Sequence, residues 1–223
     1  QKALDDEDAK YIKLTANIIT TNGYLIVSQT NTIDLNGFTY SSREISDVNK
    51  AIIVTGENTI LTIEDSSQEK SGKIITTDIG TNNRIISVEE NAKLKLESGT
   101  ISNDNTDKQT SEGIYLSNGC KFIMNGGKIT LMTNEENNTA INLDGENSEL
   151  TLNNGDIIGN IIQNSIAKII RGNIQGDIFA KQPDKMSIEN ATITGKLKIL
   201  NNDTIQNLDS SAVIESGIET INQ

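Results

Sequence analysis

A short unit repeats through the middle of this 223-residue chain, and it constrains the fold more than any other feature. Each copy has two apolar residues two positions apart, then a polar turn that contains Gly, then a further apolar residue. The clearest copies are residues 94–101 (LKLESGTI), 122–129 (FIMNGGKI) and 150–157 (LTLNNGDI). An internal repeat of this length indicates a solenoid, in which each repeat is one coil stacked on the next.

The repeat has room for three short strands in each period. The Gly positions of consecutive copies, at residues 72, 99, 127 and 155, are 27, 28 and 28 residues apart, and the later periods shorten to 17 and 19. Alternation of apolar and polar residues predicts a strand on each side of this turn. A second apolar series predicts the third strand of each coil, at residues 51–54, 84–88, 113–116 and 140–143. A single coil cannot bury its own apolar face, whereas stacked coils bury Ile and Leu in continuous columns. We therefore predict an all-β parallel β-helix (β-solenoid) with three short strands per coil.

Composition supports this fold and excludes several kinds of function. The chain has 36 Ile and 28 Asn, but one Pro, one Cys and no His. Ile suits a pleated surface, Asn suits turns, and the scarcity of Pro suits unbroken ladders. The lack of His excludes imidazole-dependent nucleophiles and imidazole zinc sites, and a single Cys excludes an intramolecular disulfide. A net charge of -12 without a basic cluster argues against nucleic-acid binding, and no apolar run is long enough for membrane insertion.

The chain divides into a short acidic segment and one long domain. We expect residues 1–10, with the acidic run DDED at 5–8, to form an acidic N-terminal tail or cap. Residues 11–223 then form a single parallel β-helix domain, whose end needs a cap because it exposes strand edges. A helix over 157–170 is the local alternative, since several Ile residues there have i, i+4 spacing. The interruptions by Gly and Asn and the β-branched side chains argue against it.

Several motifs resemble those of a known family. Residues 33–39 (IDLNGFT), 61–67 (LTIEDSS) and 71–74 (SGKI) are similar to motifs of bacterial surface proteins that open and continue a right-handed parallel β-helix of the pectate-lyase-like superfamily. The resemblance implies a right-handed coil, a secreted or cell-wall location and an adhesin-like role. Because this architecture has many functions, the resemblance bears on fold and location more than on chemistry.

The same superfamily includes polysaccharide lyases and glycoside hydrolases, so an enzyme is the alternative. A lyase needs a carboxylate-bound cation beside a basic residue, but Arg171 is expected in a turn without a carboxylate cluster. An inverting hydrolase needs two carboxyl groups about 6.5–9.5 Å apart. Stacking predicts two outward columns, residues 128, 156, 173 and 192 and residues 160, 177 and 196, in which one acid lies beside Lys or an amide. We therefore expect no catalytic residues.

Outward aromatic rings are the candidate ligand-binding residues. Alternation through residues 114–116 directs Tyr115 outward, and Phe38 follows Gly37 at a position that is normally polar. An exposed ring can stack on a sugar, so Tyr115 and Phe38 are predicted to bind ligand. Other rings are expected to pack inside, namely Tyr24, Tyr40 and Phe122.

Two oxygen-rich loops, residues 103–107 (NDNTD) and 144–147 (DGEN), could hold Ca²⁺, but neither has EF-hand spacing, and no cofactor is expected. The sequence thus predicts a non-catalytic, adhesin-like protein of the extracellular bacterial cell surface. It would act as a monomeric scaffold that binds a host or environmental glycan or protein. The alternative is a carbohydrate-active enzyme or a carbohydrate-binding module of the same fold.

Overall fold

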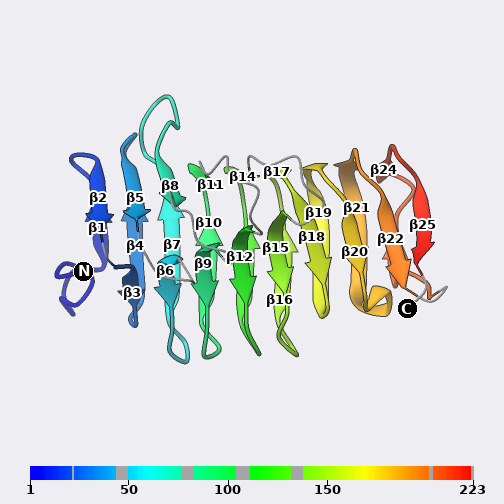
Figure 1. Ribbon diagram of the computed structural model, residues 1–223, viewed down its shortest axis with the longest axis horizontal. Coiled ribbons are helices and arrows are strands. Elements are labelled where there is room, and N and C mark those ends of the chain that lie inside the picture. The colour runs from blue at the N-terminus through cyan, green and yellow to red at the C-terminus, as the bar shows by residue number, and fades with distance from the viewer. Residues whose placement is uncertain are drawn as a thin grey trace.

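The computed structural model describes residues 1–21, 23–43, 50–76, 83–103, 111–131, 138–200 and 203–221. In these residues the chain winds into a column of stacked coils, with three strands to each coil (Figure 1). The corresponding strands of successive coils pair in parallel along the whole column. An all-β parallel β-helix with three short strands per coil is therefore confirmed, and no α-helix occurs among the described residues.

The strands form three faces, and in the first six coils each face has one strand of each coil. Face one contains β1 (Tyr11–Lys13), β4 (Asn31–Asp34), β7 (Ile60–Glu64), β10 (Lys93–Leu96), β13 (Lys121–Met124) and β16 (Glu149–Leu152). Face two contains β2 (Ile18–Thr21), β5 (Thr39–Arg43), β8 (Lys73–Thr76), β11 (Thr100–Asn103), β14 (Lys128–Leu131) and β17 (Asp156–Ile158). Face three contains β3 (Leu25–Val27), β6 (Lys50–Val54), β9 (Asn83–Val88), β12 (Ser111–Leu116), β15 (Thr139–Leu143), β18 (Asn160–Gln163), β20 (Ile178–Ala180), β22 (Leu197–Leu200) and β25 (Ile218–Ile221).

In the later, shorter coils, one long strand runs across faces one and two. These strands are β19 (Ile166–Gln175) and β21 (Met186–Ile193), and β21 pairs in turn with β23 (Asn207–Leu208) and β24 (Val213–Ile214). The expected turn at Arg171 is wrong, because Arg171 lies inside β19 and pairs in register with Asn190. Gly172, with a φ of 143°, lies beside it where the strand passes the corner. Residues 157–170 thus contain parts of β17, β18 and β19 and no helix.

The only Pro of the chain stands outside the ladders. It begins a short 3-10 turn, η1 (Pro183–Lys185), between β20 and β21. Because Pro has no N–H to donate, a position between strands costs no ladder hydrogen bond.

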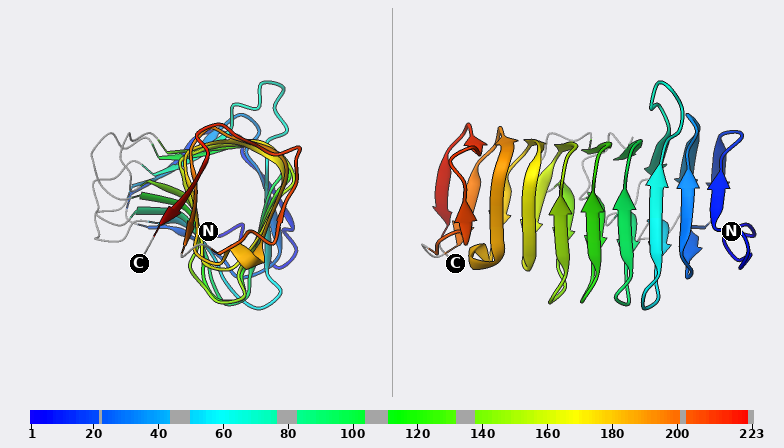
Figure 2. Two further views of the ribbon diagram at one scale, coloured as in Figure 1. Left: turned by 90° about the vertical axis from the view of Figure 1, so that its right-hand side faces the viewer. Right: turned by 180° about the vertical axis from the view of Figure 1, so that it is seen from behind.

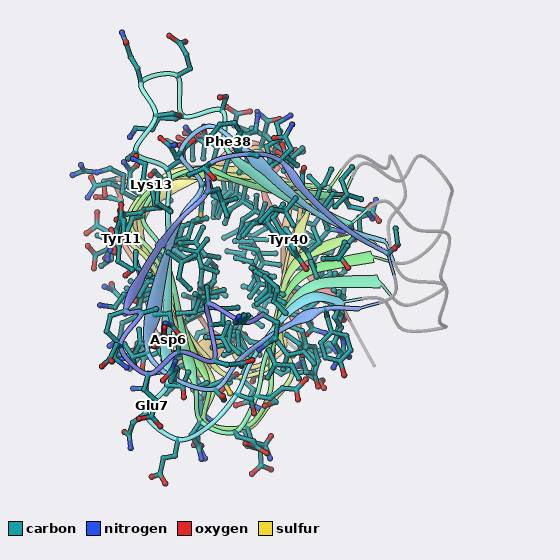
Figure 3. All side chains as sticks on the ribbon, turned by 90° about the vertical axis from the view of Figure 1, so that its left-hand side faces the viewer. Asp6, Glu7, Tyr11, Lys13, Phe38 and Tyr40 are labelled. Carbon is teal, nitrogen blue, oxygen red and sulfur yellow. The ribbon has the colours of Figure 1, made fainter. Side chains whose placement is uncertain are left out.

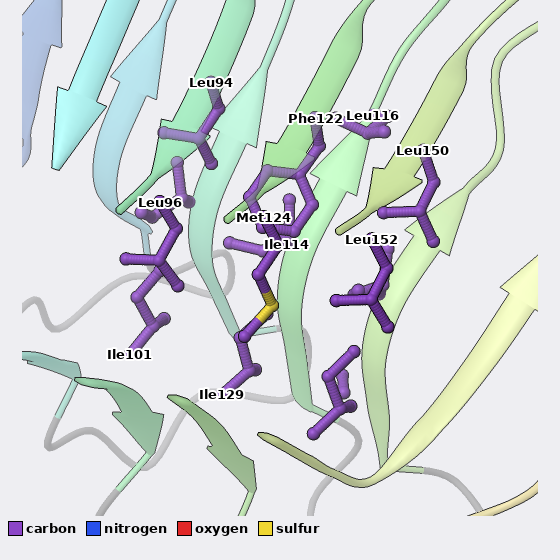
Figure 4. Close-up of a cluster of buried hydrophobic side chains, with 14 of the residues drawn as sticks. Leu94, Leu96, Ile101, Ile114, Leu116, Phe122, Met124, Ile129, Leu150 and Leu152 are labelled. Atoms are coloured by element: carbon purple, nitrogen blue, oxygen red, sulfur yellow. The ribbon is translucent and has the colours of Figure 1, made fainter. Parts of the chain in front are cut away.

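Inward side chains stack in columns along the core, as the repeat predicts. One column on face one joins Leu61, Leu94, Phe122, Leu150 and Ala167, and all five are fully buried. Figure 4 shows part of this column beside its neighbours. Burial of one such Leu or Phe side chain contributes roughly 1.5–3 kcal/mol to folding. The core therefore depends on the neighbouring coils and not on any single coil.

A Gly at the corner between faces one and two allows the coils to stack closely. Gly127 has a φ of 78°, a region that L-residues with a side chain rarely adopt. A Cβ atom at this position would lie 2.7 Å from the carbonyl oxygen of Gly99 in the preceding coil. Both the backbone angle and the close approach therefore require Gly.

The N-terminal end of the column is covered by residues 1–10, which contain no strand (Figure 2). Leu4 is only 4% exposed and belongs to the core, whereas the acidic residues 5–8 are exposed. The side-chain amide of Gln1 binds both backbone polar groups of Ile26, with its Oε1 2.8 Å from the N–H nitrogen and its Nε2 3.0 Å from the carbonyl oxygen. Gln1 thus occupies part of the free edge of β3.

The first coil also corrects one expectation about aromatic residues. Tyr24 is 40% exposed, so its expected position inside the core is wrong, whereas Tyr40 and Phe122 are buried. Tyr24 lies in the first coil, so no preceding coil covers it.

No helix among the described residues is long and apolar enough to cross a membrane.

Candidate functional site

Tyr115 projects outward from face three. On β12 it lies between Ile114 and Leu116, which are both fully buried, so the predicted alternation is confirmed. In register, Tyr115 stands beside Ser87 of the preceding coil and Asn142 of the following coil. The parallel ladders therefore fix which side chains can reach its ring.

Four residues from three successive coils surround this ring: Arg84, Glu112, Asn142 and Asp144. Together with Tyr115 we call them the Tyr115 cluster. The guanidinium carbon of Arg84 lies 3.5 Å from the centroid of the Tyr115 ring. Arg84 Nε donates to Glu112 Oε2 at 2.7 Å, and Asn142 Nδ2 donates to Glu112 Oε1 at 2.7 Å. The Tyr115 hydroxyl donates to Asp144 Oδ2 at 2.8 Å. Every side chain of the cluster is thus held by at least one other.

The contacts of the cluster define its chemistry. Burial and the hydrogen bond to Asp144 raise the pKa of Tyr115, so its hydroxyl remains a donor at neutral pH. The Arg84 guanidinium lies over the ring, so Tyr115 is part of a stacked pair and not a bare platform. One positive and two negative side chains form the cluster, together with the Asn142 amide. The cluster therefore places hydrogen-bond acceptors, the two carboxylates, next to hydrogen-bond donors, the guanidinium and the amide.

A second polar group extends the cluster along face three toward the N-terminus. Lys50 Nζ lies 2.9 Å from Glu89 Oε1, and the Ser87 hydroxyl donates to the same oxygen at 2.7 Å. Burial acts to raise the pKa of Glu89, but the bonds from Lys50 and Ser87 outweigh it, and the pKa is lowered. Polar side chains therefore continue from β6 to β15.

Toward the C-terminus, the outward column of Tyr115 continues to Phe179. Lys198 Nζ lies 4.5 Å from the centroid of the Phe179 ring.

Phe38, the other predicted ligand-binding residue, is not near Tyr115. It lies at the corner between β4 and β5, on the opposite side of the end view from Asp6 and Glu7 (Figure 3). Its ring is partly buried and packs against the core. The structure therefore does not bring the two residues into one site, and ligand contact by either remains a prediction.

A second cluster, on face one, was not predicted from the sequence. The Tyr11 hydroxyl lies 2.8 Å from Asp34 Oδ2 and 3.0 Å from Glu64 Oε1, so its single proton is shared between carboxylates of two coils. Asp34 Oδ2 also lies 3.2 Å from Lys13 Nζ, and Ser66 donates to Asp34 through its hydroxyl and its N–H. Burial acts to raise the pKa of Asp34, but the hydrogen bonds, first those from Ser66, lower it overall. Through Ser66, this cluster holds the segment that follows β7 against Asp34 of the preceding coil.

The carboxyl groups with a resolved pKa shift do not have the raised pKa of a general acid. Where a shift is resolved in the described residues, the carboxyl pKa is always lowered: Asp34, Asp65, Glu89, Asp177, Asp209 and Glu219. An acid catalyst at neutral pH needs a raised pKa. These six carboxyl groups therefore serve as hydrogen-bond acceptors or ion-pair partners.

The two outward columns expected from the repeat are present. Lys128, Asp156, Asn173 and Thr192 are in register, and Asn173 Nδ2 donates to Asp156 Oδ1 at 2.9 Å. In the other column, the Asp177 N–H donates to Asn160 Oδ1 and the Lys196 N–H donates to Asp177 Oδ1. These bonds join successive coils.

Of the two loops considered for Ca²⁺, the structure describes residues 144–147 in full. In the 144–147 loop, Asp144 receives the Tyr115 hydroxyl, and the Glu146 N–H donates to Asn118 Oδ1. Across the described ranges, no three acidic or Cys side chains are grouped to hold a metal ion. Of the 103–107 loop, residues 104–107 lie outside the described residues.

Most of the Tyr115 cluster was missed at the sequence level, although a signal for it exists. Aligning the third strands at 84–88, 113–116 and 140–143 places Arg84, Tyr115 and Asn142 on one face of adjacent coils. Their contacts also depend on side-chain conformations that alignment does not give.

Comparison of the chain with protein-family models, with curated proteins and with solved structures gives no match.

Proposed function

We propose that the chain is a non-catalytic, adhesin-like scaffold of the bacterial cell surface, and that its Tyr115 cluster binds a neutral host or environmental glycan. The observation that carries the proposal is the Arg84–Tyr115 pair, 3.5 Å apart on the outer surface of face three. The cell-surface location rests on the family resemblance of residues 33–39, 61–67 and 71–74.

The cluster offers the groups that sugar hydroxyls require. The carboxylates of Glu112 and Asp144 accept hydrogen bonds, while Arg84 and the Asn142 amide donate them. Tyr and Arg are also the residue types that most often dominate binding surfaces. Since the cluster is already held together by hydrogen bonds, little side-chain entropy is lost when a ligand binds.

Charge favours a neutral glycan over an acidic one. The cluster has two carboxylates for one guanidinium, and the chain as a whole has a net charge of -12. The resulting negative potential repels uronic and sialic acids.

A glycan array followed by calorimetric titration of the best neutral glycan tests this proposal. Tyr115→Ala should weaken binding at least tenfold, because it removes both the ring and the hydroxyl. Tyr115→Phe keeps the ring and should give an intermediate loss. Phe179→Ala is the matched control, since Phe179 stands in the same outward column under a Lys but outside the cluster. Its affinity should stay within twofold of the unchanged protein.

Three results would overturn the proposal. They are the absence of any glycan ligand, equal affinity of Tyr115→Ala, and a general preference for acidic glycans. New reducing or unsaturated ends in polysaccharide incubated with the protein would instead establish the enzymatic alternative.

A further inference from the structure

An apolar cavity of about 170 Å³ lies at the N-terminal end of the column, beneath residues 1–4. Its walls come from the inward side chains of the first three coils, and Figure 3 shows this end with Tyr40 inside it. The lining is almost entirely apolar and includes Ala3, Leu4, Leu14, Ile33, Tyr40 and Ile74.

The few polar groups at the cavity already have partners within the protein. Thr20 Oγ1 lies 3.3 Å from the Tyr40 hydroxyl and donates to the Gly23 carbonyl, and the Tyr40 hydroxyl donates to the Ala51 carbonyl at 3.2 Å. The Gln1 amide is bound to the backbone of Ile26. A buried water needs two to four polar partners, and this lining offers few free ones. The cavity therefore favours an apolar occupant over water.

From its size and lining we infer that this cavity binds a small, uncharged, apolar molecule of about the size of a benzene ring. A cavity of about 150 Å³ lined by Leu, Ile and Phe stays dry and binds benzene or xenon. The present cavity has similar volume and the same kind of lining. This site is separate from the Tyr115 cluster, so it does not depend on the proposed glycan binding.

The covering segment and the exposed residues around it form the surroundings of the cavity. Leu4 is the buried apolar anchor of the covering segment, and Gln29 Nε2 holds that segment through the carbonyl oxygens of Leu4 and Asp6 at 2.7 and 2.9 Å. Exposed apolar side chains gather in the same first coil: Tyr11, Ile18, Ile19, Tyr24 and Ile26. An apolar molecule can therefore collect at this end, next to the cavity.

Titration of the full chain with benzene, followed by ¹³C-methyl NMR and thermal unfolding, tests the inference. Methyl signals of the lining Ile and Leu residues should shift and saturate, and the Tm should rise with benzene concentration. Ala3→Leu fills part of the cavity and should weaken binding at least fivefold. Ala212→Leu makes the same change at the far end of the column and should bind like the unchanged protein. Benzoate, the charged analogue, should not bind.

Leu4→Ala provides a second variant in case Ala3→Leu does not fold. It enlarges the cavity and should allow indole, a larger ring system, to bind at least as tightly as benzene. The inference is overturned if the lining methyls do not shift in benzene-saturated buffer. It is also overturned if Ala3→Leu binds benzene as tightly as the unchanged protein, or if benzoate binds equally well.

Discussion

Asp65 is a buried carboxylate in the loop between β7 and β8, and it organises that loop. It is 1% exposed and accepts hydrogen bonds from the backbone N–H groups of Gly37, Ser67 and Gly72, at 2.8, 3.0 and 2.6 Å. Burial acts to raise its pKa, but the hydrogen bonds outweigh this and lower it. A Cβ atom on Gly72 would lie 2.5 Å from Leu35 Cβ, so the close approach of this chain to the carboxylate depends on Gly72.

Asp65→Asn should lower the free energy of unfolding by about 2 kcal/mol at pH 7, because the amide presents an NH₂ group to backbone donors. The effect should depend on pH. A lowered pKa in the folded state stabilises the protein above the ordinary Asp pKa of about 4, and this stability is lost as the pH falls through the lowered value. The difference between the variant and the unchanged protein should therefore narrow below about pH 4. Urea unfolding from pH 3 to pH 7 measures it.

Asp209→Asn is the matched control, because Asp209 accepts two bonds from Ser211 in an exposed turn. Its unfolding midpoint should change little at any of these pH values. A pH-independent loss in Asp65→Asn, or an equal loss in Asp209→Asn, would contradict the role assigned to the buried charge.

At the scale of strands and turns, most of the fold could be predicted because it repeats. Alternating residues and corner Gly residues recur at matching positions, so register follows from alignment of residues 94–101, 122–129 and 150–157. The continuous strand β19 could not be predicted in this way, since Gly172 there permits a bend within a strand as readily as a turn. Of the Tyr115 cluster, only the outward orientation of Tyr115 was predicted from the sequence. Its contacts join coils about 28 residues apart in sequence, and their side-chain geometry has no periodic signal.

Gly127→Ala should destabilise the protein by about 2 kcal/mol or more, since it places a side chain at positive φ and against a carbonyl oxygen of the preceding coil. Ala191→Gly is the control from a later coil. Ala191 lies in β21 and pairs in register with Gly172, so this position already accepts Ala. That change should cost about 1 kcal/mol or less. Chemical denaturation of both variants measures the difference. Equal losses would show that the corner does not require Gly.

At the scale of the whole molecule, the two ends of the column differ. The N-terminal coil is covered by residues 1–10, and Leu4 enters its core. In the last coil, Leu208 and Ile218 continue inward columns, yet they are 39% and 55% exposed, whereas Ile188 and Leu197 beneath them are fully buried. The sequence predicts that a solenoid end needs covering, but which residues cover it depends on non-repeating contacts such as those of Gln1.

Hydrogen exchange should therefore follow position along the column. Each coil contacts only its neighbours, so a coil with one exposed side opens most easily. Amides of β25 should exchange at least about a hundredfold faster than those of β12 and β15, since the central strands are paired on both sides. Leu4→Ala should accelerate exchange in β3 and leave β15 unchanged, which separates local opening from a general loss of stability. Mass-spectrometric exchange of the full chain measures both effects, and uniform protection from β3 to β25 would contradict this account.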